Sequence, residues 1–322
     1  MSEDKSKICV VGAGNWGKNH IDTLHHLRCL GGIVDSNKKL LNNFSKQHQN
    51  IKTYSNLEEA IKNKQFLGFI VATPAETHYK IAKKIINAGK HVLIEKPMTL
   101  EIRHAEELVK IAKEKMINIM VGHLLLFHPA IRRIYDIISD GRIGQLQYIY
   151  SNRLNLGKVR TKENVFWSLA PHDIAIFQYL AGEFPEKINA HGSSFLQKDI
   201  CDSTITHLKY ANGVEGHIFV SWLHPFKEHR LVVIGSKGMI SFEDSESEKP
   251  LKLYSKNFDF KGGKPQKFDG PIDSIKYENK MALSEELLYF IKHLNGEKLK
   301  IANGDHAIQV IRILVEASSQ IQ

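Results

Sequence analysis

Residues 8–17 read Ile8-Cys9-Val10-Val11-Gly12-Ala13-Gly14-Asn15-Trp16-Gly17, an apolar run followed directly by the pattern Gly-x-Gly-x-x-Gly. In such a pattern Gly12 allows a tight turn after a strand, Gly14 lets backbone N–H groups approach a pyrophosphate, and Gly17 lets the next helix pack on the sheet. The pyrophosphate would lie at the positive N-terminus of that helix, beside Asn15 and Trp16. The stretch therefore predicts a strand, a dinucleotide-binding turn and a helix.

Asp35 ends the next apolar run, Gly31–Val34, eighteen positions after Gly17. A carboxylate at this place can accept a hydrogen bond from a ribose 2′-hydroxyl and repels a 2′-phosphate, which favours NAD over NADP. Lys38 and Lys39 follow closely and keep NADP open as an alternative. A turn aspartate is the structural alternative for Asp35.

Length and composition limit the class of protein. The chain has 322 residues, of which 42% are hydrophobic, so it can form two domains with ordinary cores. No apolar run approaches the roughly 18 residues of a membrane helix, and the N-terminus from Met1 to Lys7 is polar, so we expect a cytoplasmic protein. Three scattered cysteines without a Cys-x-x-Cys pair, and histidines without ligand spacing, predict reduced thiols and no metal site.

The formal net charge of +9 is compatible with nucleic acid or with an anionic small molecule. The lysines are spread through the chain, and residues 106–115 alternate in sign as on a solvated helix face. The pattern therefore argues against nucleic-acid binding and leaves an anionic small-molecule ligand.

Residues 1–122 alternate apolar runs with amphipathic stretches, as in a parallel sheet covered by helices. We predict a doubly wound α/β domain, with helix starts at Ser55 or Asn56 and at Thr99, and a helix end at Gly89. Its predicted strands are Lys7–Val11, Gly31–Val34, Phe66–Val71, His91–Ile94 and Ile117–Val121. Its predicted helices are Trp16–Leu27, Lys38–Gln47, Asn56–Lys62, Glu76–Ala88 and Glu101–Lys115.

Residues 123–322 differ in character and predict an α+β domain with a mostly antiparallel open sheet. Hairpin turns are expected at 211–213 and 235–238, and long surface loops at Asp244–Tyr277, which is rich in Lys, Gly, Pro and Asp. The predicted strands are Leu146–Leu154, Ser203–Tyr210, Val214–Trp222, Arg230–Ile234 and Met239–Glu243. The predicted helices are Pro129–Ser139, Pro171–Leu180, Ala282–Leu294 and Asp305–Ser319.

Two further motifs follow predicted strands of the first domain. Thr73 and Pro74 follow Phe66–Val71, and His78 lies in the next helix, so we expect these three residues to line the cofactor, with strand termination and a helix-face histidine as the alternatives. Glu95-Lys96-Pro97 follows His91–Ile94. There the Lys96 ammonium would point to the nicotinamide, donate to a substrate hydroxyl and, with its pKa lowered by burial, relay a proton. A surface turn is the alternative, and a cis bond before Pro97 is left open.

Together, the Gly12–Gly17 loop, Asp35, Ala72-Thr73-Pro74 and above all Glu95-Lys96-Pro97 resemble the Gfo/Idh/MocA oxidoreductase family. The resemblance spans nearly the whole chain. It implies that Lys96 contacts cofactor ribose and substrate, and that a histidine of the second domain is the acid or base. It also implies that a sheet face of this domain forms a homodimer or homotetramer.

His172, in Trp167-Ser168-Leu169-Ala170-Pro171-His172-Asp173, is the matching histidine. Family members usually carry Asp-x-Gly-x-His here, so Ser168 stands where the acid is expected and Ala170 where the glycine is. Pro171 suits a first helical position, which predicts that the helix dipole lowers the pKa of His172. A structural histidine is the alternative.

Other polar residues are candidates for substrate contact, each with ordinary packing or a loop contact as the alternative. His123 lies at the expected domain junction, where the family lines its active site. The remaining candidates precede His172 and carry groups that hold a phosphate, a sugar hydroxyl or a ring face: Arg153, Arg160, Asn164, Trp167 and Ser168.

The resemblance implies NAD-dependent oxidation of a sugar hydroxyl, with Lys96 and His172 acting on it. The variant around His172 and the Gly122-His123-x5-Pro129 junction are most similar to members that act on nucleotide-linked sugars. We therefore expect oxidation at C3 of a UDP-N-acetylhexosamine or its uronate, in nucleotide-sugar and polysaccharide biosynthesis. A free-sugar or polyol dehydrogenase and a catalytically silent NAD-binding sensor are the alternatives.

Overall fold

The computed structural model describes residues 7–48 and 51–321, and the polar N-terminal residues 1–6 lie outside this range. The chain forms two compact units. The first comprises the described residues up to Phe127 together with Lys280–Ile311, and the second comprises His128–Asn279 with the end of the chain. The segment that starts at Lys280 thus returns to the first unit. The predicted domains, 1–122 and 123–322, did not include this return.

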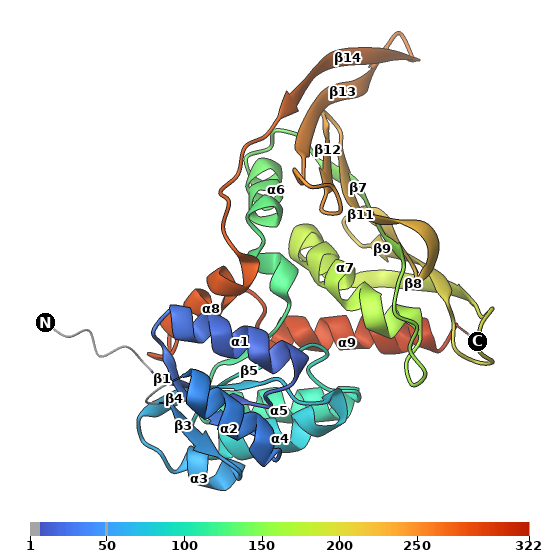
Figure 1. The fold of residues 1–322 in the computed structure, drawn as a ribbon. Helices are drawn as coiled ribbons and strands as arrows, with labels where there is room; N and C mark the ends of the chain where they lie inside the picture. Colours follow the sequence, from blue (N-terminus) through green and yellow to red (C-terminus); the bar gives the residue numbers. More distant parts are fainter. Residues whose placement is uncertain (1–6, 49–50, 322) are drawn as a thin grey trace, which may run out of the picture. The chain divides into compact units, whose positions relative to one another are not determined.

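The first unit is a six-stranded parallel sheet in the order β3-β2-β1-β4-β5-β6 (Figure 1). Its strands are β1 (Lys7–Val11), β2 (Leu30–Val34), β3 (Lys52–Tyr54), β4 (Phe66–Val71), β5 (His91–Ile94) and β6 (Ile119–Val121). Its helical elements are α1 (Asn15–His26), α2 (Lys38–Gln47), α3 (Leu57–Ile61), α4 (Ala75–Asn87), α5 (Ile102–Glu114), η1 (Leu124–Phe127), α8 (Ala282–Lys292) and the first half of α9 (Gly304–Ser318). The order of the strands confirms the predicted Rossmann fold.

Local chemistry explains two of the predicted helix ends of this unit, the start of α3 and the end of α4. Asn56 caps α3 by accepting from the Glu58 N–H, and Gly89 follows α4 with a φ of +73°. The prediction that Thr99 caps α5 is wrong, because Glu101 is the residue before the helix and the Thr99 hydroxyl donates to its carbonyl oxygen. Strand β3 was not predicted, since three residues with no buried side chain give no periodic signal.

The second unit is an eight-stranded sheet in the order β14-β13-β12-β11-β7-β10-β9-β8. Its strands are β7 (Leu146–Leu156), β8 (Pro185–Ser193), β9 (Ser203–Tyr210), β10 (Glu215–Ser221), β11 (Leu223–Gly235), β12 (Met239–Glu243), β13 (Leu251–Lys261) and β14 (Lys264–Ser274). Its two full helices are α6 (Pro129–Ser139) and α7 (Val165–Ala181). The pairs are antiparallel except β7 with β10, as expected of a mostly antiparallel sheet.

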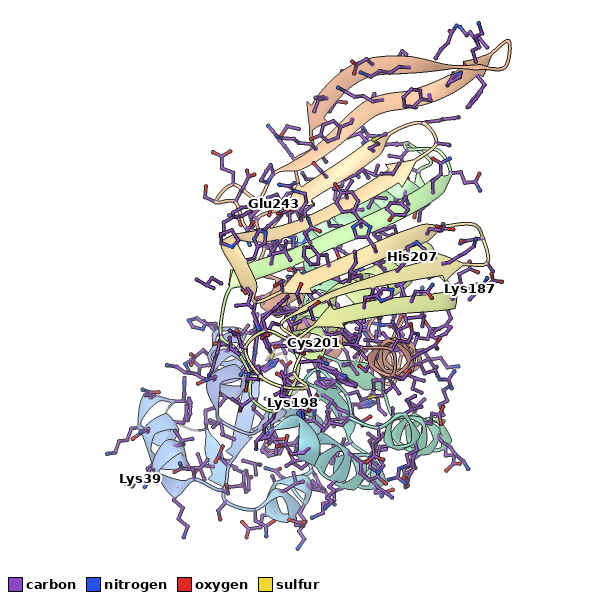
Figure 2. All side chains as sticks on the ribbon, turned by 90° about the vertical axis from the view of Figure 1, so that its right-hand side faces the viewer. Lys39, Lys187, Lys198, Cys201, His207 and Glu243 are labelled. Atoms are coloured by element: carbon purple, nitrogen blue, oxygen red, sulfur yellow. The ribbon has the colours of Figure 1, made fainter. Side chains whose placement is uncertain are left out.

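One face of this sheet packs on α7 and the other is open. Along β9, Thr204, Thr206 and Leu208 are buried, whereas Ile205 and His207 are exposed to different degrees on the other face. Figure 2 looks onto the open face and labels His207 on β9 and Lys187 on β8. This alternation is the period-two pattern that made β9 predictable.

The prediction of long surface loops at Asp244–Tyr277 is wrong, because most of this stretch forms the hairpin β13–β14. Its turn is made by Gly262 and Gly263, with φ angles of +60° and +75°. The outer parts of both strands are exposed on both faces, Phe258 at 62% and Phe268 at 55%. A strand that buries neither face has no reason to alternate apolar and polar residues, so the hairpin gave no signal.

Helix α7 begins six residues before the predicted start. Asn164 caps it by accepting from the Trp167 N–H at 3.1 Å, and Pro171 lies inside the helix instead of at its first position. The apolar residues Val165 and Phe166 are fully buried and form its first turn. The chain thus enters the helix at a good cap and tolerates the proline within it.

Among the described residues, the helices are too short or too polar to cross a membrane.

Candidate active site

The three glycines of the Gly12–Gly17 loop have the geometry that a dinucleotide requires. Gly12 has a φ of +93°, and a Cβ on it would lie 2.8 Å from the Ala72 carbonyl oxygen. A Cβ on Gly17 would lie 1.9 Å from the Gly12 carbonyl oxygen, so only glycine lets α1 start here. By contrast, a Cβ on Gly14 would have no described atom within 4 Å, which leaves that side of the loop open to a ligand.

The N-terminus of α1 is exposed beside this opening. Gly14 is its N-cap residue, and the structure shows neither a side-chain cap nor an acidic residue in the first turn of this described helix. Asn15 and Trp16 are exposed at its start, Trp16 at 44%. Together with the helix dipole, this end of α1 fits the pyrophosphate of a dinucleotide.

Asp35 lies directly after β2 and is joined to the same loop. Its Oδ2 accepts from the Ala13 N–H at 2.7 Å, and its Oδ1 accepts from the Asn37 N–H at 2.8 Å. The carboxylate is therefore held beside the glycines, with lone pairs left for a ribose hydroxyl. The glycine loop, the uncapped helix and Asp35 fit NAD as the cofactor.

His78 on α4 joins two loops at the ends of parallel strands. Its Nε2 lies 2.8 Å from the Thr73 carbonyl oxygen and its Nδ1 lies 2.9 Å from the Pro97 carbonyl oxygen. The ring is 1% exposed, so both nitrogens are used within the protein. His78 therefore connects the Thr73-Pro74 loop to the Lys96-Pro97 turn, and its ring nitrogens do not face a cofactor.

Lys96 lies in the turn after β5, and the Lys96–Pro97 peptide bond is cis. The preceding side chain, Glu95, is 12% exposed and faces the protein: its Oε1 lies 2.6 Å from His20 Nε2, and its Oε2 accepts from the Lys96 N–H at 3.2 Å. The Glu95 carboxylate thus supports the turn, and the Lys96 side chain that follows it is partly exposed.

His123 follows β6 and lies near Lys96. It is 2% exposed, its ring contacts the edge of His306 at 5.4 Å between centroids, and neither ring nitrogen has a hydrogen-bond partner among the described residues. Burial, then the neighbouring His306 and Lys96, lowers the pKa of His123 well below its usual value. His123 is therefore a neutral imidazole with unused hydrogen-bonding capacity beside Lys96.

In the second unit, Ser168 and His172 lie one turn apart on α7 and are both partly exposed. Their spacing of four residues places them on one face of the helix. His172 is the eighth residue of α7. The prediction that the helix dipole lowers its pKa is therefore wrong, because the effect of the dipole is confined to the first turn.

The other candidates of this unit have partners within the protein. Arg153 makes a bidentate ion pair with Asp173, at 2.6 Å and 3.0 Å, and Asp173 is 2% exposed. Burial opposes the charge of Arg153, but Asp173 raises the pKa of the guanidinium overall. The indole N–H of Trp167 donates to the Ser318 hydroxyl at 2.8 Å. Arg160 makes an ion pair with Glu163 in which both side chains are exposed. Of these residues, Arg160 therefore has the side chain that is most accessible to a ligand.

Sequence reasoning missed two buried residues of the first unit, His20 on α1 and Glu286 on α8, which are 0% and 1% exposed. Each is a titratable residue at a position where an amphipathic helix should carry an apolar one. That departure from the pattern was the available signal.

The first unit is a Rossmann fold whose glycine loop, helix N-terminus and Asp35 suit NAD, and the second unit is a mostly antiparallel open sheet. This combination is typical of a class of NAD-binding oxidoreductases. The chain belongs to the Gfo/Idh/MocA family. The family model "Oxidoreductase family, NAD-binding Rossmann fold" matches residues 6–123, and the model "GFO/IDH/MocA C-terminal domain" matches residues 131–241.

Individual relatives are more distant. The chain is 23% identical over 320 residues to a UDP-N-acetylglucosamine 3-dehydrogenase of Acidithiobacillus ferrooxidans. The aligned region covers 97% of this chain and 97% of the relative. It is 24% identical over 260 residues to a myo-inositol 2-dehydrogenase of Thermotoga maritima, covering 77% of this chain and 78% of the relative. A solved structure of the first enzyme has the same fold, with a TM-score of 0.86 at 21% identity over 98% of this chain and 97% of the other.

Proposed function

We propose that this chain oxidises a sugar hydroxyl with NAD, and that the hydroxyl is at C3 of a UDP-N-acetylhexosamine or its uronate. The observation that carries the proposal is the similarity to a UDP-N-acetylglucosamine 3-dehydrogenase over 97% of both chains, thus over both units. The presence of Lys96 after β5 and of His172 on α7 supports a working enzyme over a silent sensor.

In the proposed reaction the substrate carbon loses a hydride, its oxygen loses a proton, and a ketone forms. His172 accepts the proton, as a neutral imidazole can. Lys96 donates a hydrogen bond to the same oxygen and stabilises the negative charge that develops on it. When bound, NAD supplies the acceptor for the hydride.

Ser168 is the point at which this chain departs from the family's Asp-x-Gly-x-His pattern. A hydroxyl at this place can donate to or accept from a sugar hydroxyl, but it brings no charge. We propose that Ser168, His123 and Arg160 contact the substrate. Arg153, Asn164 and Trp167 then act through the protein contacts described above, holding α7 in place.

We also propose a cytoplasmic homodimer or homotetramer that uses the open face of the eight-stranded sheet, with a small-molecule sugar as its partner. That face exposes Ile205 at 46% on β9, a residue that a second copy could cover. Native mass spectrometry of the wild-type protein beside Ile205→Lys tests the assembly.

The catalytic roles are tested by Lys96→Ala and His172→Ala, assayed by NADH formation on the substrate that the wild-type enzyme uses. Each variant should lose about two to four orders of magnitude in turnover, because each removes a group that acts on the proton or charge of the reacting hydroxyl. NAD binding, measured by calorimetry, should persist. Lys113→Ala and His26→Ala, at exposed lysine and histidine positions, are the matched controls. Near-normal turnover in either test variant would overturn the assignment of that residue.

The myo-inositol 2-dehydrogenase relative has a similar identity, 24%, and favours polyol oxidation as a second candidate. Polyol oxidation differs from oxidation of a UDP-sugar in that the enzyme needs no binding site for a diphosphate. Activity on inositol and none on UDP-sugars would select it.

A further inference from the structure

The loop between β8 and β9, residues 194–202, is built around the buried carboxylate of Asp202, which is 0% exposed. Its Oδ2 accepts from the Phe195 N–H at 2.6 Å and from the Leu196 N–H at 2.8 Å. Its Oδ1 accepts from the indole N–H of Trp222 at 2.5 Å. Three neutral donors thus surround one carboxylate, and two of them belong to the backbone of the loop.

The backbone of Asp202 is itself fixed to the sheet on two sides. Its N–H donates to the Ser193 carbonyl oxygen at 2.8 Å, where β8 ends. Its carbonyl oxygen accepts from the Trp222 N–H at 3.2 Å and from the Ser221 hydroxyl at 3.2 Å, where β10 ends. The carboxylate is therefore a fixed point, and residues 195 and 196 are attached to it.

Hydrogen bonds hold this loop, because the burial of its apolar side chains contributes little. Phe195 is 70% exposed and Leu196 is 53% exposed, so they gain little hydrophobic stabilisation. Burial opposes the charge of Asp202, but the N–H groups of Leu196 and Phe195 and then the Trp222 indole lower its pKa overall. The carboxylate is ionised at neutral pH, and hydrogen bonds to a charged acceptor are the stronger kind.

The same loop holds the segment that leads into α7 at two places. The Gln197 side-chain amide donates from Nε2 to the Arg160 carbonyl oxygen at 2.8 Å. The Cys201 carbonyl oxygen accepts from the N–H of Val165, the first residue of α7, at 3.0 Å (Figure 2 labels Cys201). All four residues belong to the second unit. Residues 160–165 are thus attached to the β8–β9 loop at both ends.

We propose that Asp202 is a positioning residue for substrate binding: its carboxylate fixes the β8–β9 loop, and the loop fixes the segment that carries Arg160. Without the carboxylate, the Phe195 and Leu196 N–H groups lose their acceptor and the loop gains freedom. Binding then has to order the loop and Arg160, which weakens it. The link to the substrate rests on the proposed role of Arg160, whereas the effect on the loop does not.

The hold on the loop is tested by hydrogen–deuterium exchange of full-length Asp202→Ala, measured by mass spectrometry on peptides that cover residues 194–202. The Phe195 and Leu196 amides should exchange at least about tenfold faster than in wild type, because each loses a charged acceptor. Trp222→Phe is the matched control, since it removes the indole donor and keeps the carboxylate, and its loop should stay protected. Unchanged exchange in Asp202→Ala, or equally faster exchange throughout β9, would overturn the proposal.

Steady-state kinetics on the substrate that the wild-type enzyme uses separates positioning from a general loss of structure. In Asp202→Ala the Km for the sugar should rise about three- to tenfold, while kcat stays within about threefold because α7 keeps its Asn164 cap. NAD binding, measured by calorimetry, should be unchanged, since the glycine loop lies in the first unit. Trp222→Phe should keep the Km within about twofold. An unchanged sugar Km in Asp202→Ala, or parallel losses in Km, kcat and NAD binding, would overturn the positioning role.

Gln197→Met gives a second test that does not depend on a buried residue, so it decides the matter if Asp202→Ala does not fold. Met has a similar length but no donor for the Arg160 carbonyl, and Gln197 is partly exposed. The Km for the sugar should rise about threefold or more with unchanged exchange of the Phe195 and Leu196 amides. An unchanged Km would overturn the link to Arg160. If Arg160→Ala itself leaves the Km unchanged, the proposed substrate contact fails while the exchange result for the loop stands.

Discussion

At the scale of single residues, the best-defined part of the site is the link between Asp35 and the glycine loop. One carboxylate oxygen accepts from the Ala13 N–H and the other from the Asn37 N–H. The carboxylate is held beside the glycine loop, where we expect the cofactor ribose, and its charge would repel a 2′-phosphate.

Replacing Asp35 with Ser should therefore change the choice of cofactor. The Km for NAD should rise about tenfold or more, the equivalent of losing a charged hydrogen bond of about 1.5–3 kcal/mol, and activity with NADP should increase. Steady-state kinetics with both cofactors measures the change. Asp35→Asn is the control, since it keeps an acceptor for Ala13 but loses the charge. An unchanged preference in both variants would mean that Asp35 serves only the turn.

The residues of the site differ in how far the sequence could predict them. Gly12, Gly14 and Gly17 were predictable because their constraints are local: a turn, an open side and a close helix contact. The contacts of Arg153 and His78 were not, because their partners are Asp173, twenty positions away, and the carbonyl groups of two separate loops. Long-range partners of this kind leave no periodic trace.

At the scale of elements, α7 determines how Ser168 and His172 are presented. The helix begins at Val165 with Asn164 as its cap, so both residues belong to its body and not to its first turn. Pro171 favoured a helix start at that residue, but the Asn164 cap and the buried apolar residues before Pro171 outweigh the preference of proline for a first position.

The capping role predicts that Asn164→Ala lowers the free energy of unfolding by about 1 kcal/mol, because the Trp167 N–H loses its acceptor. Urea unfolding measures this, and Asn164→Asp should retain the stability. The Km for the sugar should stay unchanged in both variants. A raised Km with unchanged stability would instead place Asn164 on the substrate.

Other elements show the same limit. The buried strands β1, β4 and β5 were predicted with their observed bounds, because continuous apolar runs identify strands covered on both faces. The hairpin β13–β14 and the short strand β3 were not, since they bury little and depend on pairing with a neighbour.

At the scale of the whole molecule, the chain leaves the first unit near Phe127 and returns to it at Lys280. Helix α8, part of the returning segment, packs against α1 and η1 of the first unit. The alternation of strands and helices was enough to predict the fold class. The pattern of an amphipathic helix, however, shows that one face is buried and not which sheet buries it. The return of the chain to the first unit therefore had to come from the structure.

We propose that this NAD-binding oxidoreductase acts on a nucleotide-linked sugar. The most direct measurement is NADH formation by the wild-type enzyme with UDP-N-acetylglucosamine, UDP-N-acetylgalactosamine and their uronates, beside myo-inositol and free glucose. NADH should form with at least one UDP-sugar and at most weakly with the free compounds. Rapid NADH formation with inositol or glucose and none with any UDP-sugar, or tight NAD binding without turnover of any compound, would contradict the account.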